Sequence, residues 1–573
     1  MWNFSGRQND TQSYGGTVNG NWITGINFLD KNRIGTSDMP PDMKNDPSRC
    51  VYFLLPFILG IIGMLYHYTN DKKNWWIIML LFLMTGLAIV IYLNQYPNQP
   101  RERDYAYAGS FYFYAVWIGL GVLVLFQALS KFLKENVAAP IASIVCFFAV
   151  PVIMGSENWT IHDRSGRYLT RDVAFNYLNS CAPDAILFTN GDNDTFPLWY
   201  AQEVEAKRTD VRVCNLMLLN TDWYINQMKH KNYGSDPLPV TLPVKKYYDG
   251  VNNQVFIVEK TKEPVDISTI IEWVNSDNKA TKVEISSDEV LDIIPSRTIR
   301  IPVDAAKVIA SGTVKPEDAD KIVPYIDIKL KGNSIMKSQL IVLDILAHND
   351  WKRPIYFVTG YHNDAMGLEE YFQLEGLAYR LVPIKSVNKS WLEYGRIDAG
   401  ILYDNMMKKF VWGGAKEKGV TIDYNHRRTL LVVKARYNYA RLAKALAGEG
   451  KNEKAIQVLD YCMETLPVDK LSWDMYMPDL VEAYFAAGAA DKAVDLTNKL
   501  SSYYMEKMDY YFKQSPNILS SSDFEIQSAI QYISRVGAAC KENGKPEISA
   551  DLTTKLEKYY SQYMKTVQPA KQQ

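Results

Sequence analysis

A short charged segment lies between two stretches that are apolar enough to cross a membrane. It reads Arg101-Glu102-Arg103-Asp104-Tyr105 and continues with Ala106-Tyr107. Charges beside hydrocarbon are costly, and they usually serve an anionic headgroup, an ion pair or a translocation path. Arginine is well shaped to bind a phosphate through two parallel hydrogen bonds. The segment predicts either a site for a lipid-borne phosphate or a simple anchor among lipid headgroups.

In the phosphate interpretation each residue type has a role. Arg101 and Arg103 would hold the phosphate at the membrane surface, and Glu102 or Asp104 would orient the two arginines. Tyr105 would lie at headgroup level or stack on a sugar.

A second polar cluster, Asp192-Asn193-Asp194, follows the apolar run Ala185–Thr189. This run predicts a strand, and open α/β sheets usually bind ligands beyond the carboxyl ends of their strands. The two aspartates could therefore hold a divalent cation. They could equally cap the next helix, with Pro197 in its first turn. Two carboxylates and an amide are a weak metal signal, and both interpretations stay open.

Composition and cysteine spacing exclude several classes of protein. The 63 basic and 64 acidic residues balance, so the chain has no broad field for nucleic acid. The six cysteines form no CxxC pair and predict no zinc site, and a disulfide between Cys181 and Cys214 is compatible with the sequence without being indicated by its pattern. No Walker loop, HExxH, GxSxG or GxGxxG motif occurs in a credible context.

Four apolar stretches near bilayer length predict a transmembrane bundle of about four spans within residues 50–154. They cover about 50–66, 75–94, 108–130 and 138–154. The tight connections carry Lys72-Lys73 and Lys131, which favour the cytoplasm by the positive-inside tendency. Three parts of the chain would then lie on the outer face: residues 1–49, the Arg101 segment and everything after 155. Arg7 and Asp10 would lie on the same face as the charged segment. Against this orientation, residues 1–49 also contain basic residues.

The rest of the chain predicts two soluble domains. From 155 to 426, alternating strand and helix patterns favour an α/β domain with a parallel sheet, including a late helix at 338–348 followed by a strand at 354–358. From 427 to 573 the pattern is helical and resembles tetratricopeptide repeats, with two copies offset by 38 residues and a weaker third. Residues 1–49 predict an ordered loop segment.

Four segments of the chain resemble one family. They are Trp2–Asp10, Gly20-Asn21-Trp22, Arg101–Ser110 and Gly191–Tyr200, and they are similar to the TMEM260-like Bacteroidetes membrane proteins grouped with protein O-mannosyltransferases of the GT-C class. The resemblance implies a multi-span enzyme of the bacterial inner membrane with its soluble region in the periplasm. Such an enzyme would transfer mannose from a polyprenyl-phosphate carrier to Ser or Thr of exported proteins.

The chain departs from this family in one respect. GT-C enzymes carry their catalytic carboxylate in the first extracytoplasmic loop, upstream of the block that begins at Trp2 here. We therefore expect the chain to be the C-terminal part of the enzyme and assign no catalytic residue. A truncated gene, a split gene whose N-terminal half is encoded separately, and a fragment of a longer protein stay open. The alternative function is a membrane-anchored repeat scaffold for envelope protein assembly, without catalytic activity.

Overall fold

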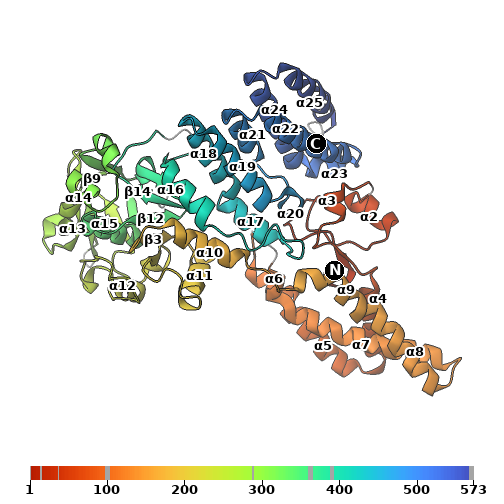
Figure 1. The fold of residues 1–573 in the computed structure, drawn as a ribbon. Coiled ribbons are helices and arrows are strands. Elements are labelled where there is room, and N and C mark those ends of the chain that lie inside the picture. Colours follow the sequence, from red (N-terminus) through yellow and green to blue (C-terminus); the bar gives the residue numbers. More distant parts are fainter. Residues whose placement is uncertain are drawn as a thin grey trace.

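The computed structural model describes residues 2–12, 16–36, 38–96, 103–286, 289–358, 365–387 and 393–566. Figure 1 shows that a helical bundle projects from the rest of the molecule, while the strands gather at the far end. Of the C-terminal helices, α17 (Tyr424–Val432), α18 (Ala435–Gly448) and α19 (Asn452–Thr465) lie between the strands and the opening segment. Helices α24 (Asp523–Glu542) and α25 (Pro546–Thr566) extend above that segment in this view. The chain is thus largely helical, with small sheets in its middle and a helical C-terminal region.

Among the described residues, three continuous helices are long and apolar enough to span a membrane: Lys72–Leu93, Asp104–Ser130 and Glu135–His162. The prediction of about four spans is not confirmed. The first apolar stretch forms a helix of 16 residues, Leu55–Asn70, which is about 24 Å long and shorter than the ~30 Å hydrocarbon layer. The elements of the bundle are α4 (Leu55–Asn70), α5 (Lys72–Thr85), α6 (Leu87–Leu93), η1 (Asp104–Tyr107), α7 (Ala108–Ser130), α8 (Glu135–Phe147), the π-helical turn η2 (Phe148–Val152) and α9 (Ile153–His162).

Helices α4 and α7 cross at very short range because glycines line both helices at the crossing. A methyl group on Gly63 would lie 1.8 Å from the carbonyl oxygen of Trp117, and one on Gly121 would lie 2.4 Å from that of Leu59. Small residues at membrane helix interfaces permit this approach, and van der Waals contact between the backbones then stabilises the pair.

The polar parts of the chain leave the bundle at one end. Short turns at Asp71 and at 131–134 reverse the chain at the opposite end. Helices α4, α6 and α9 consequently meet the rest of the molecule at the same end of the bundle, beside the opening segment and α17 (Tyr424–Val432) (Figure 1). The opening segment and the soluble region therefore lie at the same end of the bundle. That they share one face of the membrane, and which face this is, stays a prediction, because α4 is not among the membrane-length helices.

The sheet in the middle of the chain contains the predicted βαβ unit. Its strand order is β15-β13-β14-β12-β3-β4. Strand β3 pairs in parallel with β4 and with β12, as predicted, whereas β14 is antiparallel to β12. The elements are α10 (Leu169–Ser180), β3 (Ile186–Thr189), α11 (Asp192–Glu203), β4 (Arg212–Asn215), α12 (Asp222–Met228), α15 (Lys337–Asn349), β12 (Ile355–Val358), β13 (Phe372–Leu374), β14 (Ala378–Leu381), β15 (Arg396–Ile397) and α16 (Ala399–Tyr403).

Between α12 and α15 the chain makes two further small sheets, which the sequence pattern could not order. Their strand orders are β10-β9-β6 and β11-β5-β8-β7. The elements are β5 (Gln254–Ile257), β6 (Val265–Asp266), α13 (Ile267–Asn275), β7 (Lys282–Ser286), β8 (Glu289–Ile294), β9 (Thr298–Pro302), α14 (Ala305–Ala310), β10 (Tyr325–Lys329) and β11 (Ser334–Met336).

The C-terminal region consists of helices that pack as stacked hairpins. Helix α18 contacts α19 and α21, α21 contacts α22 and α24, and α24 contacts α25. This packing buries the small and apolar faces on which the repeat prediction was based, but assignment to the tetratricopeptide class stays a prediction. The elements are α17 (Tyr424–Val432), α18 (Ala435–Gly448), α19 (Asn452–Thr465), α20 (Val468–Leu471), α21 (Met477–Ala486), α22 (Ala490–Phe512), α23 (Pro516–Ser521), α24 (Asp523–Glu542) and α25 (Pro546–Thr566).

All six cysteines are free and buried. The disulfide that the sequence left open between Cys181 and Cys214 is absent. Burial raises the pKa of both thiols, because an apolar interior disfavours the thiolate. The two residues act as core side chains.

The close crossing of α4 and α7 generates a first prediction. Gly63→Ala should lower the stability of the full chain in detergent by about 1–3 kcal/mol, because its methyl group overlaps the α7 backbone. Thermal unfolding followed by tryptophan fluorescence measures this. Gly119→Ala is the matched control, since nothing lies within 4 Å of a methyl group at that position of α7. Equal unfolding temperatures for the two variants would contradict the crossing.

Candidate functional site

A pocket of about 190 Å³ lies where the opening segment, the start of α7 and helix α17 meet. Four of the residues that the sequence predicted for one site line it, although they come from two segments almost a hundred positions apart. The lining residues are Trp2, Arg7, Asp10, Asp104, Tyr105, Tyr424 and Asn425.

The opening segment forms a compact loop that presents Arg7. It contains α1 (Trp2–Ser5), β1 (Gly6–Arg7), α2 (Asn27–Ile34), α3 (Pro41–Lys44) and β2 (Cys50–Val51). Strand β1 pairs antiparallel with β2, and Gly6 is needed there because a side chain would meet the Cys50 carbonyl oxygen at 2.7 Å and because its φ is +139°. The strand pair thereby sets the position of Arg7.

Two of the three nitrogens of the Arg7 guanidinium are engaged by other described groups of the protein. Nη1 pairs with Asp10 Oδ1 at 2.7 Å, and Nε donates to the Ser48 carbonyl oxygen at 3.0 Å. Nη2 is buried and has no hydrogen-bond partner within the described ranges. A buried donor without a partner is costly, so this nitrogen is suited to an additional acceptor such as a phosphate oxygen.

Asp10 lies in a partly desolvated position. Burial raises the pKa of its carboxyl group, Arg7 opposes that shift, and the nearby Asp46 and Asp423 reinforce it. A carboxyl group in such a position holds its proton to higher pH than usual. It can accept hydrogen bonds from ligand hydroxyls close to the arginine.

Asp104 and Tyr105 place the pocket at the beginning of a membrane-length helix. Both belong to η1, which runs directly into α7 and forms the first turn of the span Asp104–Ser130. Arg103 is exposed just before η1 and is not among the lining residues. Arg101 and Glu102 lie outside the described residues, so the structure brings together only part of the predicted charged segment, and its binding role stays a prediction.

Helix α17 closes the pocket on the side opposite the membrane helices. Asp423 caps it by accepting the backbone N–H of His426 at 2.9 Å. The same carboxylate receives Arg167 Nη1 at 2.9 Å, and this arginine follows the last membrane-length helix. Although burial raises the pKa of Asp423, the bonds from His426 and the charge of Arg167 outweigh it and hold the pKa well below its usual value.

Tyr424 and Asn425 are the first two residues of α17, and the cap by Asp423 positions them in the wall of the pocket. The sequence analysis identified neither residue. An aspartate before a helical run was the only local signal for the start of α17. A second link fastens the helix to the opening segment, since Arg427 Nη2 lies 3.3 Å from Asp46 Oδ2. The first turn of α17 also brings the positive end of a helix dipole toward the pocket.

The arrangement suits a ligand that combines an anion with hydroxyl groups. Arg7 and the start of α17 favour negative charge. Asp10, Asp104 and Asn425 offer hydrogen-bonding groups, and the aromatic side chains of Trp2, Tyr105 and Tyr424 supply apolar surface. A lipid-linked sugar phosphate has both kinds of group.

The Asp192-Asn193-Asp194 loop caps a helix. Oxygens Oδ1 and Oδ2 of Asp194 accept the backbone N–H groups of Gly191 and Asn190, each at 2.8 Å. Within the described part of the chain no group of three or more His, Cys, Asp and Glu side chains is placed to hold a metal ion. Of the two alternatives for this loop, the geometry therefore favours capping, because the oxygens of Asp194 are engaged by backbone donors.

The cap at α11 can be tested by substitution. Asp194→Ala should lower the stability of the chain by about 1 kcal/mol, since two backbone donors lose their acceptor. The exposed neighbour Asn193→Ala should leave stability within about 0.5 kcal/mol. Thermal unfolding with and without millimolar Mg²⁺ or Mn²⁺ checks both. A metal-dependent stabilisation of the wild type that Asp192→Ala removes would support the cation alternative instead.

Asp423 should be the most sensitive residue around the pocket. Asp423→Ala removes the α17 cap and leaves Arg167, whose side chain is 4% exposed, without its partner, so a loss of about 3 kcal/mol is expected. The exposed ion pair of Asp495 with Lys499 is a matched control, and Asp495→Ala should change stability by less than about 1 kcal/mol.

The same carboxylate predicts the direction of a pH effect. Because the pKa of Asp423 is lower in the folded state, its stabilisation is fully present above the ordinary carboxyl pKa of about 4 and is lost as pH falls below it. Unfolding measured between pH 3 and pH 7 should therefore show that the free energy of unfolding falls more steeply with decreasing pH in the wild type than in Asp423→Ala. Parallel curves would refute the role of this carboxylate.

Comparison with known proteins supports one part of the resemblance. Residues 170–401 match the family described as TMEM260-associated domain 2. This segment covers the sheet and its insertions, and the match is consistent with a TMEM260-like family. No curated protein and no solved structure matches the chain.

Proposed function

We propose that the chain is part of a membrane glycosyltransferase that transfers mannose or a related sugar from a polyprenyl-phosphate carrier to Ser or Thr of exported proteins. The observation that carries the proposal is the convergence of Arg7, Asp10, Asp104 and Tyr105 on one pocket at the first turn of a membrane-length helix. The TMEM260-associated domain fits a membrane glycosyltransferase-like family loosely, and the sugar and the acceptor are part of the proposal.

The position of the pocket suits an amphiphilic donor. A polyprenyl chain would remain in the hydrocarbon layer beside α7, while its phosphate would reach the surface where η1 begins. There Arg7 would bind the phosphate through the nitrogen that no described residue engages. The sugar would then lie against the aromatic rings, with its hydroxyl groups donating to the carboxylates of Asp10 and Asp104.

We assign binding of the donor to this pocket, and no residue of the chain is assigned to bond cleavage. Stabilisation of the departing lipid phosphate by a guanidinium is the form of catalytic help that such a site can supply. In this proposal the protein belongs to the bacterial inner membrane and its soluble region faces the periplasm, where exported acceptor proteins arrive.

Arg7 provides the direct test. In the full chain embedded in lipid nanodiscs, Arg7→Ala should weaken binding of a short-chain polyprenyl phosphate by about tenfold or more, because one charge-assisted hydrogen bond contributes about 1.5–3 kcal/mol. Arg7→Lys should bind with intermediate affinity, since it keeps the charge but loses the forked geometry. Native mass spectrometry or ligand-induced thermal shift measures both.

Lys31→Ala is the control, because Lys31 is an exposed cation of the same opening segment. Its affinity for polyprenyl phosphate should equal that of the wild type. If Arg7→Ala also binds as the wild type does, the pocket is not the phosphate site. If glycosylation of exported proteins in cells is unchanged by Arg7→Ala as well, the scaffold alternative is favoured.

A further inference from the structure

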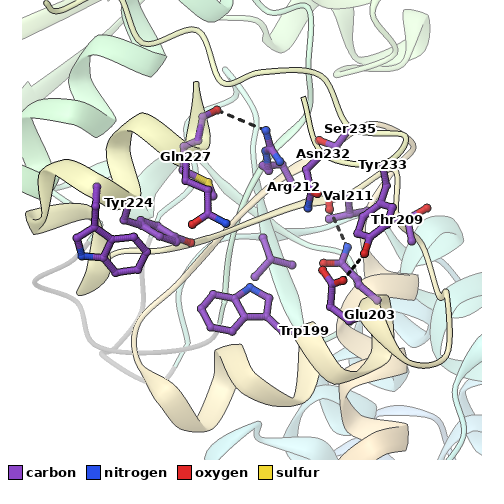
Figure 2. Close-up of a pocket in the computed structure, with 14 residues that line it drawn as sticks. Trp199, Glu203, Thr209, Val211, Arg212, Tyr224, Gln227, Asn232, Tyr233 and Ser235 are labelled. Atoms are coloured by element: carbon purple, nitrogen blue, oxygen red, sulfur yellow. Dashed lines mark hydrogen bonds between the residues drawn. The ribbon is translucent and has the colours of Figure 1, made fainter. Parts of the chain in front are cut away.

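A second pocket, of about 340 Å³, lies at the free edge of the six-stranded sheet (Figure 2). Strand β4 is the last strand in the sheet order, so one of its sides has no neighbouring strand among the described residues. Helices α11 and α12 flank this edge, and the turn at 232–235 closes one end. The pocket volume is within the range of ~300–1,000 Å³ that is typical of small-molecule sites.

Aromatic rings supply much of the wall. Trp223 is 55% exposed and Tyr233 is 57% exposed, which is high for large rings that line one cavity. Trp199 of α11 is half-buried beneath them and stacks on Phe196 with ring centroids 5.3 Å apart. Flat aromatic faces of this kind match the C–H face of a sugar ring, which is apolar while the edge of that ring is polar.

The polar groups between the rings have hydrogen-bonding capacity to spare. The amides of Gln227 and Asn232 are exposed and make no side-chain hydrogen bond within the described part of the chain, and each amide can both donate and accept. Tyr233 donates its hydroxyl proton to Glu203. That bond, together with the Asn232–Ser235 bridge, holds the ring of Tyr233 over the pocket.

The floor of the pocket carries a buried positive charge. Arg212 is 3% exposed, and its Nη2 donates to the carbonyl oxygens of Met228 and His230. Nε has no hydrogen-bond partner and no carboxylate pairs with the guanidinium, as far as the described residues extend. Burial lowers the pKa of Arg212, as expected of a cation held away from water without a counter-ion.

A second guanidinium adds positive charge beside the pocket. Arg353 donates from Nη2 to Ser235 Oγ at 3.1 Å, beside the pocket, and its guanidinium also donates to the backbone carbonyl oxygens of Asp184 and Asp236. The only acid among the lining residues is Glu203, which lies exposed at the rim and is engaged by Tyr233. Figure 2 shows Trp199, Gln227, Arg212 and Glu203 around the same hollow. The bottom of the pocket therefore carries positive charge, and its rim carries negative charge.

We propose that this pocket binds a carbohydrate unit that carries a carboxylate, such as a uronic acid. The aromatic rings would stack on the sugar, the amides and Glu203 would bind its hydroxyl groups, and the carboxylate would face the buried guanidinium. This site is separate from the donor pocket at the membrane, and its failure would leave the proposed glycosyltransferase function untouched.

The test compares two ligands that differ in one group. Methyl glucuronide and methyl glucoside are titrated separately into the full chain in detergent, with binding followed by ligand-observed NMR or calorimetry. The glucuronide should bind about tenfold or more tightly than the glucoside, since only the former offers an anion to Arg212. Using the ligand pair avoids a substitution of Arg212, which could unfold the sheet edge.

Two substitutions locate the binding. Trp223→Ala should weaken glucuronide binding by about tenfold or more, as expected for loss of a central aromatic contact. Tyr248→Ala is the control, because Tyr248 is 58% exposed and does not line the pocket. Equal affinities for the two glycosides, no binding of either one, or full glucuronide binding by Trp223→Ala would each overturn the proposal.

Discussion

The carboxylate of Asp423 is the interaction on which the arrangement of the site depends. It joins the exit of the last membrane-length helix, through Arg167, to the first turn of α17, through His426. Because both attachments use the same side chain, the start of α17 and the exit of the last membrane-length helix are held next to each other. The pair is costly to break, because the loss of Asp423 would leave the buried guanidinium of Arg167 without its carboxylate partner.

The membrane imposes the second constraint. Apolar helices must cross the hydrocarbon layer with their backbone bonds satisfied internally, so polar segments are confined to its two sides. Here the turns between the helices of the bundle are short at one end, and the opening segment, η1 and the soluble region lie at the other end (Figure 1). Segments that are distant in sequence, such as those of Arg7 and Asp104, are therefore brought to the same surface. The glycine-lined crossing of α4 and α7 keeps the bundle narrow beneath them.

The two pockets illustrate different uses of arginine. Arg7 pairs with Asp10 and retains one nitrogen that no described residue engages, whereas Arg212 is buried at a sheet edge and pairs with no acid among the described residues. The first arrangement suits a ligand delivered by the membrane, and the second suits a soluble group that enters from the side. Both ligands would combine a sugar with an anion, as the proposed glycosyltransferase function requires of its donor.

The sequence by itself determined the local features. Runs of apolar residues predicted helices of membrane length, and the strand and helix around Asp194 were placed correctly by their periodicity and turn residues. The segments of Arg7 and of Asp104 were also identified as chemically significant before their proximity was known. These features depend on interactions between residues close in the chain, which a sequence pattern records directly.

Only the tertiary structure decided which of these segments meet. It showed that α4 is shorter than the three membrane-length helices, that Asp194 accepts backbone N–H groups at the start of α11, and that Tyr424 and Asn425 complete the pocket of Arg7. It also revealed the pocket at β4, whose lining residues follow no linear motif. The physical reason is that packing and long-range ion pairs join residues hundreds of positions apart, and such contacts leave no periodic trace in a single sequence.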